Sequence, residues 1–262
     1  MKPPHAALVA GGVDPTGGAG LAVDIAFLSR LGVRVAPLVT ALTVQDDKGV
    51  RQIQAVDRDL LIDMAAAALS AVRVSLAVMK TGLVPNLALA RTLATIARDA
   101  RVPLVVDPIL AAGTGDVLHR GNPRVVIAPL IEAAALLLPN LDEAEQLSGI
   151  AWDRSREGMM AMARALSTPT RTVAVSGGHA PGATVPMAIA GPAGEAMLDV
   201  PRAEIGATHG TGCALAASAA GYIAQGLPPG EAAAAAHRFV AAALTASKGL
   251  AGTRLTPEPW TV

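Results

Sequence analysis

The sequence contains little cysteine, few aromatic residues and no net charge. Cys213 is the single cysteine in 262 residues, so no disulfide can form within the chain, as is usual in a reducing compartment. Aromatic residues make up 2% of the chain, too few for the stacking platforms of single-strand binders. Lysine and arginine number 21 and so do aspartate and glutamate, so no net charge attracts nucleic acid. We therefore expect a cytoplasmic protein with no nucleic-acid partner.

Long hydrophobic runs are also absent, although 52% of the residues are hydrophobic. A membrane-spanning helix needs about 18 or more uninterrupted apolar residues. Glu132 interrupts the run that begins at Val125, and Gln225 ends the run that begins at Cys213. The N-terminal apolar segment is too short for a secretion signal. The apolar content therefore predicts a large buried core and no membrane partner.

Short apolar runs alternate with helical patterns along most of the chain. Runs typical of buried strands lie at 5–12, 33–44, 74–82, 102–108 and 171–178. Patterns typical of helices lie at 19–32, 58–72 and 86–100, and two alanine-rich helices are expected at 210–226 and 229–247. Residues 185–202 flank a turn at 191–194 and predict an edge hairpin. This alternation predicts an α/β fold, with a mainly parallel sheet covered on both faces, in one domain over residues 1–262.

The stretch ATHGTGCA at 207–214 places Cys213 directly behind Gly-Thr-Gly, at the head of an expected helix. Unpaired backbone N–H groups and the helix dipole favour an anion at Gly210, Thr211 and Gly212, although an ordinary helix cap has the same sequence. The dipole is also expected to lower the pKa of the thiol, which suits a proton acceptor. The alternative for Cys213 is a small, buried packing residue.

Three further polar residues are candidates for a site. Asp24 lies about one turn into a helix that is largely apolar, so it is either paired structurally or placed to bind a ligand. Asn140 and Glu143, in PNLDEAE, share one face of an expected helix. They could orient a hydrated Mg²⁺, or they could cap that helix. The five histidines show no metal-ligand spacing, so we expect no zinc site.

Several segments together resemble a known family. AGGVDPTGGAGLAVDIAFLSRLG, TALTVQ, VVDPIL, PNLDEAE, SGGH and THGTGCA occur in an order and spacing similar to those of hydroxymethylpyrimidine/phosphomethylpyrimidine kinases, which are ribokinase-like enzymes of thiamine biosynthesis. The resemblance runs from about residue 6 to about residue 247. It implies a ribokinase-like α/β fold, ATP and Mg²⁺ as co-substrates, and a homodimer. It also implies phosphorylation of the hydroxymethyl group of 4-amino-5-hydroxymethyl-2-methylpyrimidine, or of its monophosphate.

The resemblance also assigns roles to individual residues. Cys213 would accept the proton of the substrate hydroxyl, where most of the superfamily carries aspartate. Gly210, Thr211 and Gly212 would form the anion hole. The residues expected to line the pyrimidine pocket are Ala19, Asp24, Thr43, Gln45, Leu83 and Ile109. The residues expected near ATP are Asn140, Ser176 and His209, with Glu143 at the metal.

The chain departs from the family at Ser176, because lysine usually precedes Gly-Gly-His there. A cation near the phosphates is therefore lost. Asp46-Asp47 also replaces the usual Asn-Thr, and Ala207 replaces an asparagine. Two alternatives remain open beside the pyrimidine kinase. One is a related vitamin kinase of the pyridoxal type, and the other is a non-catalytic homologue that binds the pyrimidine.

Overall fold

The computed structural model describes residues 5–46, 48–73, 75–112, 115–203 and 210–246. Nine strands of these residues form one sheet, in the order β3-β2-β1-β4-β5-β6-β7-β8-β9. The central strands pair in parallel: β2 (Arg34–Asp46), β1 (Ala6–Val13), β4 (Leu76–Thr81), β5 (Leu104–Val106), β6 (Leu136–Leu137) and β7 (Thr172–Ser176). Antiparallel pairing is confined to the edges, at β3 (Gly49–Ala55), β8 (Thr184–Gly191) and β9 (Gly194–Pro201).

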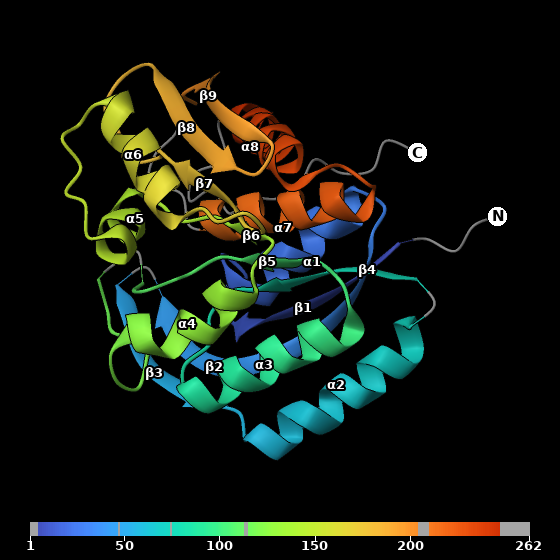
Figure 1. Cartoon of the computed structure of the whole chain (residues 1–262). Helices are drawn as coiled ribbons and strands as arrows, with labels where there is room; N and C mark the ends of the chain where they lie inside the picture. The colour runs from blue at the N-terminus through green and yellow to red at the C-terminus, as the bar shows by residue number, and fades with distance from the viewer. Residues whose placement is uncertain (1–4, 47, 74, 113–114, 204–209, 247–262) are drawn as a thin grey trace.

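Helices cover both faces of the sheet (Figure 1). One face carries α1 (Gly20–Arg30), α7 (Thr211–Ala224) and α8 (Pro229–Ala246). The other carries α2 (Arg58–Val72), α3 (Leu87–Ala100), α4 (Pro123–Ala133), α5 (Leu141–Ser148) and α6 (Arg156–Leu166). Each face has its own apolar cluster because successive side chains of a strand point to opposite sides. In β1, for example, Val9 packs with the first group of helices and Leu8 with the second.

The predicted α/β fold with a mainly parallel sheet is confirmed. Every expected strand and helix is present, and their ends differ by a few residues. Four elements had no counterpart in the sequence interpretation: β3, β6, α4 and α6. β3 reads GVRQIQA, whose exposed polar residues hide the strand pattern, and β6 has only two residues. Such short or half-exposed strands carry too little apolar periodicity to be detected. The helix α4 contains Pro129, which argues against a helix in the sequence, whereas no such signal hides α6.

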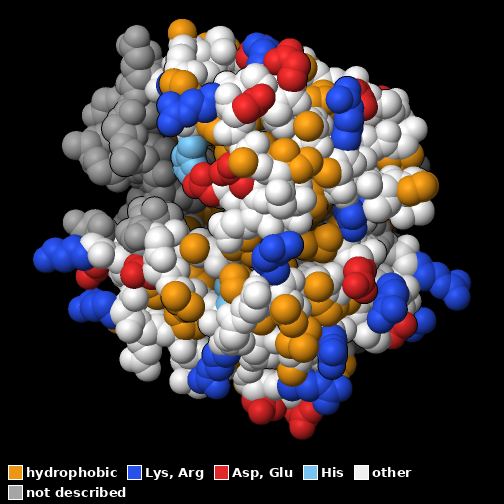
Figure 2. All heavy atoms as spheres, turned by 60° about the vertical axis from the view of Figure 1, so that its left-hand side comes forward, with side chains coloured by type: hydrophobic (Ala, Val, Ile, Leu, Met, Phe, Trp, Pro, Cys, Tyr) orange, Lys and Arg blue, Asp and Glu red, His pale blue; other side chains and the backbone are white. Residues whose placement is uncertain are grey.

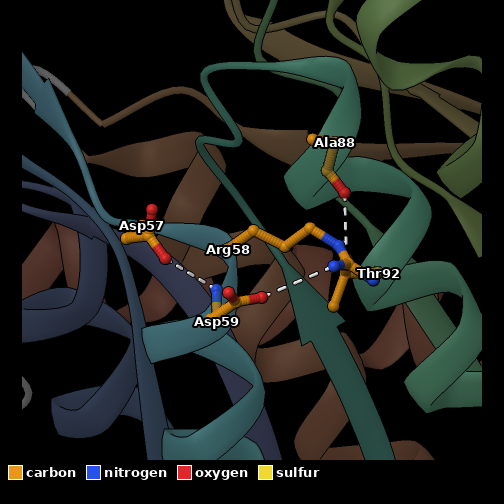
Figure 3. A network of polar contacts seen from close by, with 5 residues as sticks. All are labelled: Asp57, Arg58, Asp59, Ala88 and Thr92. Carbon is orange, nitrogen blue, oxygen red and sulfur yellow. Dashed lines mark hydrogen bonds and ion pairs between the residues drawn. The ribbon is translucent and has the colours of Figure 1, made fainter.

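The start of α2 is attached to α3 by polar contacts at the surface (Figure 3). Asp57 caps α2, and its carboxylate accepts a hydrogen bond from the backbone N–H of Asp59 at 2.8 Å. Arg58 Nε donates to Thr92 Oγ1 at 3.3 Å, and that hydroxyl donates to the carbonyl of Ala88 at 3.0 Å. The Arg58–Asp59 ion pair is exposed, so it adds little stability. The network therefore joins the two helices at the surface while adding little to stability.

Charged side chains of both signs are interspersed on the face drawn in Figure 2, without a broad basic area. Within the described residues, no helix is long and apolar enough to cross a membrane.

Candidate functional site

A cavity of about 460 Å³ opens beyond the carboxyl ends of adjacent strands. Val13 ends β1, Gln45 lies near the end of β2, and Gly82 and Asp107 directly follow β4 and β5. Ligands of open α/β sheets bind at this edge, and the volume lies within the range of small-molecule pockets.

Most of the residues expected in the site line this one cavity. They are Ala19, Asp24, Thr43, Gln45, Leu83, Ile109, Asn140, Glu143, Gly210, Thr211, Gly212 and Cys213. Ser176 does not line the cavity. It ends β7 and pairs with Asn140, and its N–H donates to the carbonyl of Pro139 at 2.9 Å. His209 lies outside the described residues.

The two glycine-rich loops of the sequence pack against each other at the cavity. Gly210 is the N-cap of α7, with φ +83°, and a side chain there would collide with the carbonyl oxygen of Gly18. Gly20 has φ +61°, and a side chain there would collide with the carbonyl oxygen of Gly12. No side chain among the described residues caps α7, so its first N–H groups can face a ligand. This arrangement suits an anion, as the sequence interpretation proposed.

Cys213 lies in the first turn of α7 and is 7% exposed. Burial, together with the charges of Asp107 and Asp24, raises the pKa of its thiol to about 12, although the charge of Lys80 opposes the shift. The expectation that the helix dipole lowers this pKa is therefore wrong for the ligand-free protein. Desolvation and two nearby carboxylates outweigh the dipole, and neither is visible in the local sequence.

A buried ion pair lies at the base of the cavity. Lys80 Nζ donates to both carboxylate oxygens of Asp24, at 2.8 and 2.9 Å, and both side chains are fully buried. This geometry supports the structural reading of Asp24, because both of its oxygens are already occupied. The sequence interpretation missed Lys80. Lys80 lies near the end of a predicted strand and just before Gly82, and residues at such strand ends are expected to lie near a ligand.

Asp107 is the second cavity residue that the sequence interpretation did not assign. It is 6% exposed, and its Oδ2 has no hydrogen-bond partner among the residues described. Burial raises its pKa to about 6, although the charge of Lys80 opposes the shift. At neutral pH this carboxylate is therefore ionised, while the nearby thiol of Cys213 is protonated.

Asn140 and Glu143 form a capping box at the start of α5. Asn140 Oδ1 accepts from the N–H of Glu143, and Glu143 Oε2 accepts from the N–H of Asn140, each at 2.9 Å. Glu143 Oε1 also accepts from the N–H of Leu110 at 3.3 Å. The helix-cap alternative is therefore realised, and the same two side chains also line the cavity.

The cavity also fits a magnesium ion that arrives with phosphates. Glu143 and Asp107 are buried acids in its wall, and Asp107 has the unpartnered oxygen described above. No three His, Cys, Asp or Glu side chains of the described residues come close enough to hold a metal ion by themselves. Mg²⁺ usually keeps several waters and binds one or two carboxylates together with substrate phosphates, which matches this donor set.

The buried acids make the stability of the fold depend on pH. Burial, helped by the charge of Asp107, raises the pKa of Glu143 to about 8 from an ordinary value of 4.5. Between these values the folded state holds a proton that the unfolded state has released, so we expect the free energy of unfolding to fall as pH rises. Urea unfolding between pH 5 and pH 8.5 in EDTA measures this slope.

In Glu143→Gln, the free energy of unfolding is expected to fall less as pH rises, because glutamine does not titrate. Asp142→Asn removes an exposed carboxylate from the same helix and serves as the matched control. A wild-type stability that rises with pH across this window would contradict the raised pKa.

The part of the cavity between the end of β2 and the loops after β4 and β5 suits a small aromatic ring. Leu83 and Ile109 supply apolar contacts, and Thr43 Oγ1 donates to the carbonyl of Val13 at 3.0 Å. The carboxylate of Asp14 accepts from the side-chain amide of Gln45. Although burial opposes ionisation, this bond and others hold the pKa of Asp14 below its ordinary value. The amide oxygen of Gln45 then remains available to accept from a ligand amino group.

Comparisons with known proteins bear on the family and the fold of the chain. A family model described as phosphomethylpyrimidine kinase matches residues 14–256. The hydroxymethylpyrimidine/phosphomethylpyrimidine kinase of Streptomyces coelicolor is 32% identical over 261 residues, covering 96% of this chain and 93% of that protein. The protein of the same name from Rhizobium meliloti is 34% identical over 251 residues, covering 93% and 92%. A pyridoxal kinase from Staphylococcus aureus in complex with ADP superposes with a TM-score of 0.82 at 26% identity, covering 93% and 89%.

Proposed function

Because the chain belongs to the phosphomethylpyrimidine kinase family, we propose that it is a phosphotransferase of thiamine biosynthesis. It transfers the γ-phosphoryl group of ATP to 4-amino-5-hydroxymethyl-2-methylpyrimidine, or to its monophosphate. The observation that carries the proposal is the single cavity that holds a ring pocket, an uncapped helix N-terminus and Cys213 together.

The pyrimidine would lie between Leu83 and Ile109, with its amino group donating to the amide oxygen of Gln45. The hydroxymethyl group would then face Cys213, which lines the same cavity. A site with one fixed amide and apolar walls selects an aminopyrimidine by shape and by its polar edge.

Phosphoryl transfer requires charge stabilisation more than covalent chemistry by the protein. The N–H groups at residues 211–213, in the first turn of α7, would bind the transferred phosphoryl group as its charge develops. The substrate oxygen attacks phosphorus, its bond to the γ-phosphoryl group forms, and the bond to the β-phosphate oxygen of ATP breaks. The hydroxyl proton passes to Cys213, whose thiol hydrogen-bonds with the carboxylate of Asp107. Because that carboxylate is ionised at neutral pH, it can take up the proton that the thiol releases.

Asn140 and Glu143 would face the nucleotide phosphates, with Glu143 and Asp107 holding the waters of a bound Mg²⁺. The ion would neutralise phosphate charge when bound. Ser176 and His209 stay predictions as nucleotide contacts. The protein would act as a homodimer in the cytoplasm, as the family resemblance implies.

The proposal is tested by coupled measurement of ADP release from the purified protein with Mg²⁺. We expect ADP to form with the aminopyrimidine or its monophosphate, and more slowly with pyridoxal. Turnover with pyridoxal alone would favour the related vitamin kinase, whose solved relative has the same fold. Calorimetric binding of the pyrimidine without ADP release would favour a non-catalytic homologue. ATP hydrolysis without a second substrate is the background to subtract.

A further inference from the structure

Arg202, directly after β9, binds the loop that connects β7 to β8. Its guanidinium donates hydrogen bonds to four carbonyl oxygens, those of Gly178 and Gly182 at 2.8 Å, Thr184 at 3.3 Å, and Ala180. It forms no ion pair with an acidic side chain among the residues described. These four hydrogen bonds hold the loop and the first residue of β8 to one guanidinium.

The loop begins with the SGGH motif and reaches the cavity through His179. His179 Nδ1 lies 3.4 Å from Oδ2 of Asp142, which also lines the cavity. In a trans peptide, the carbonyl and the following N–H point to opposite sides. Because the carbonyl of Gly178 faces Arg202, the N–H of His179 points away from the guanidinium. Within the described part of the chain, neither this N–H nor that of Gly178 has an acceptor.

We propose that Arg202 is a positioning residue for nucleotide binding. By holding the loop carbonyls on one side, it presents the N–H groups of Gly178 and His179 to the phosphate oxygens of ATP. Successive backbone N–H groups form concave sites for anions of this kind. Ser176 supplies no cation to the motif and does not line the cavity, so these N–H groups would bind the phosphates in place of a cation. This inference rests on the proposed use of ATP.

The experiment compares wild type with Arg202→Ala in steady-state kinetics and in calorimetric titration with ADP. We expect the KM for ATP and the Kd for ADP to rise about tenfold, the effect of weakening charge-assisted hydrogen bonds. The KM for the pyrimidine and kcat at saturating ATP should change less than about twofold, because the ring pocket lies on other strands. Added guanidinium ion should restore part of the affinity for ADP in Arg202→Ala.

Arg171 provides a matched control at the opposite end of β7. It also holds carbonyls, donating to Leu166 twice and to Ile131 once, and it does not line the cavity. Arg171→Ala should lower stability and leave the Kd for ADP unchanged. An equal rise in KM for ATP in both variants, or a wild-type value in Arg202→Ala, would overturn the positioning role.

Two further outcomes separate this inference from the proposed function. If wild type itself neither binds ADP nor forms it from ATP, the proposed function fails, and the role of Arg202 fails with it. If wild type binds ADP and Arg202→Ala binds it equally, only the role of Arg202 is wrong. Should Arg202→Ala not fold, Arg202→Lys keeps the charge but offers three donors, and a KM for ATP equal to wild type would refute the proposal.

Discussion

Cys213→Ala is expected to lower kcat by about 10²–10⁴-fold, which is the usual contribution of a general base. The thiol lines the cavity in the first turn of α7, beside the carboxylate of Asp107, where it could face the hydroxymethyl group of the pyrimidine. Alanine leaves the substrate proton without a direct acceptor. The Kd values for pyrimidine and ADP should change little, because the ring pocket and the phosphate donors remain.

Single-turnover and steady-state assays of ADP release measure this effect. Ser218→Ala is the matched control, because Ser218 is a fully buried polar residue of the same helix and lies outside the cavity lining. It should keep wild-type kcat. If Cys213→Ala keeps wild-type kcat as well, the thiol is a packing residue, and Asp107 or solvent takes the proton directly.

The raised thiol pKa sharpens this prediction. A thiol with a pKa of about 12 is almost fully protonated at neutral pH, so alkylation of the ligand-free protein should be slow and should accelerate with rising pH. Activity near neutral pH therefore requires that the thiol exchange its proton with a neighbour. Asp107, with a pKa of about 6, is the neighbour that is ionised at that pH.

Lys80→Met is expected to have the largest effect on stability, a loss of about 3–5 kcal/mol in the free energy of unfolding at pH 7. Both members of the Lys80–Asp24 pair are fully buried, so methionine leaves the carboxylate of Asp24 without a counter-charge in a desolvated site. For a chain of this size, the loss corresponds to a fall of about 10 °C in Tm.

Urea denaturation and thermal scanning measure the loss. Lys48→Met, at an exposed lysine, is the control and should stay within about 0.5 kcal/mol of wild type. Adding Asp24→Leu to Lys80→Met should recover part of the stability, because an apolar pair avoids the desolvation cost that a single charge pays. A Lys80→Met protein as stable as wild type would contradict the role of the pair.

The sequence predicted much of the cavity, because its motifs follow one another at the ends of strands. Parallel strands bring their carboxyl ends to one edge, so Gln45, Asn140 and Cys213 meet although they are far apart in the chain. Elements without a long apolar pattern were missed, such as β6 and the exposed strand β3. Lys80 was missed for a different reason, since a single lysine in an apolar strand carries no motif.

The sequence by itself determined the alternation of strands and helices and the family. Both features depend on residues that are close in sequence, so the spacing of residues along the chain is enough to recognise them. Only the tertiary structure decided that Asp24 pairs with Lys80, that burial raises the pKa of Cys213, and that Arg202 holds the loop after β7. The physical reason is that desolvation and charge depend on groups that other elements bring close, and no local spacing records them.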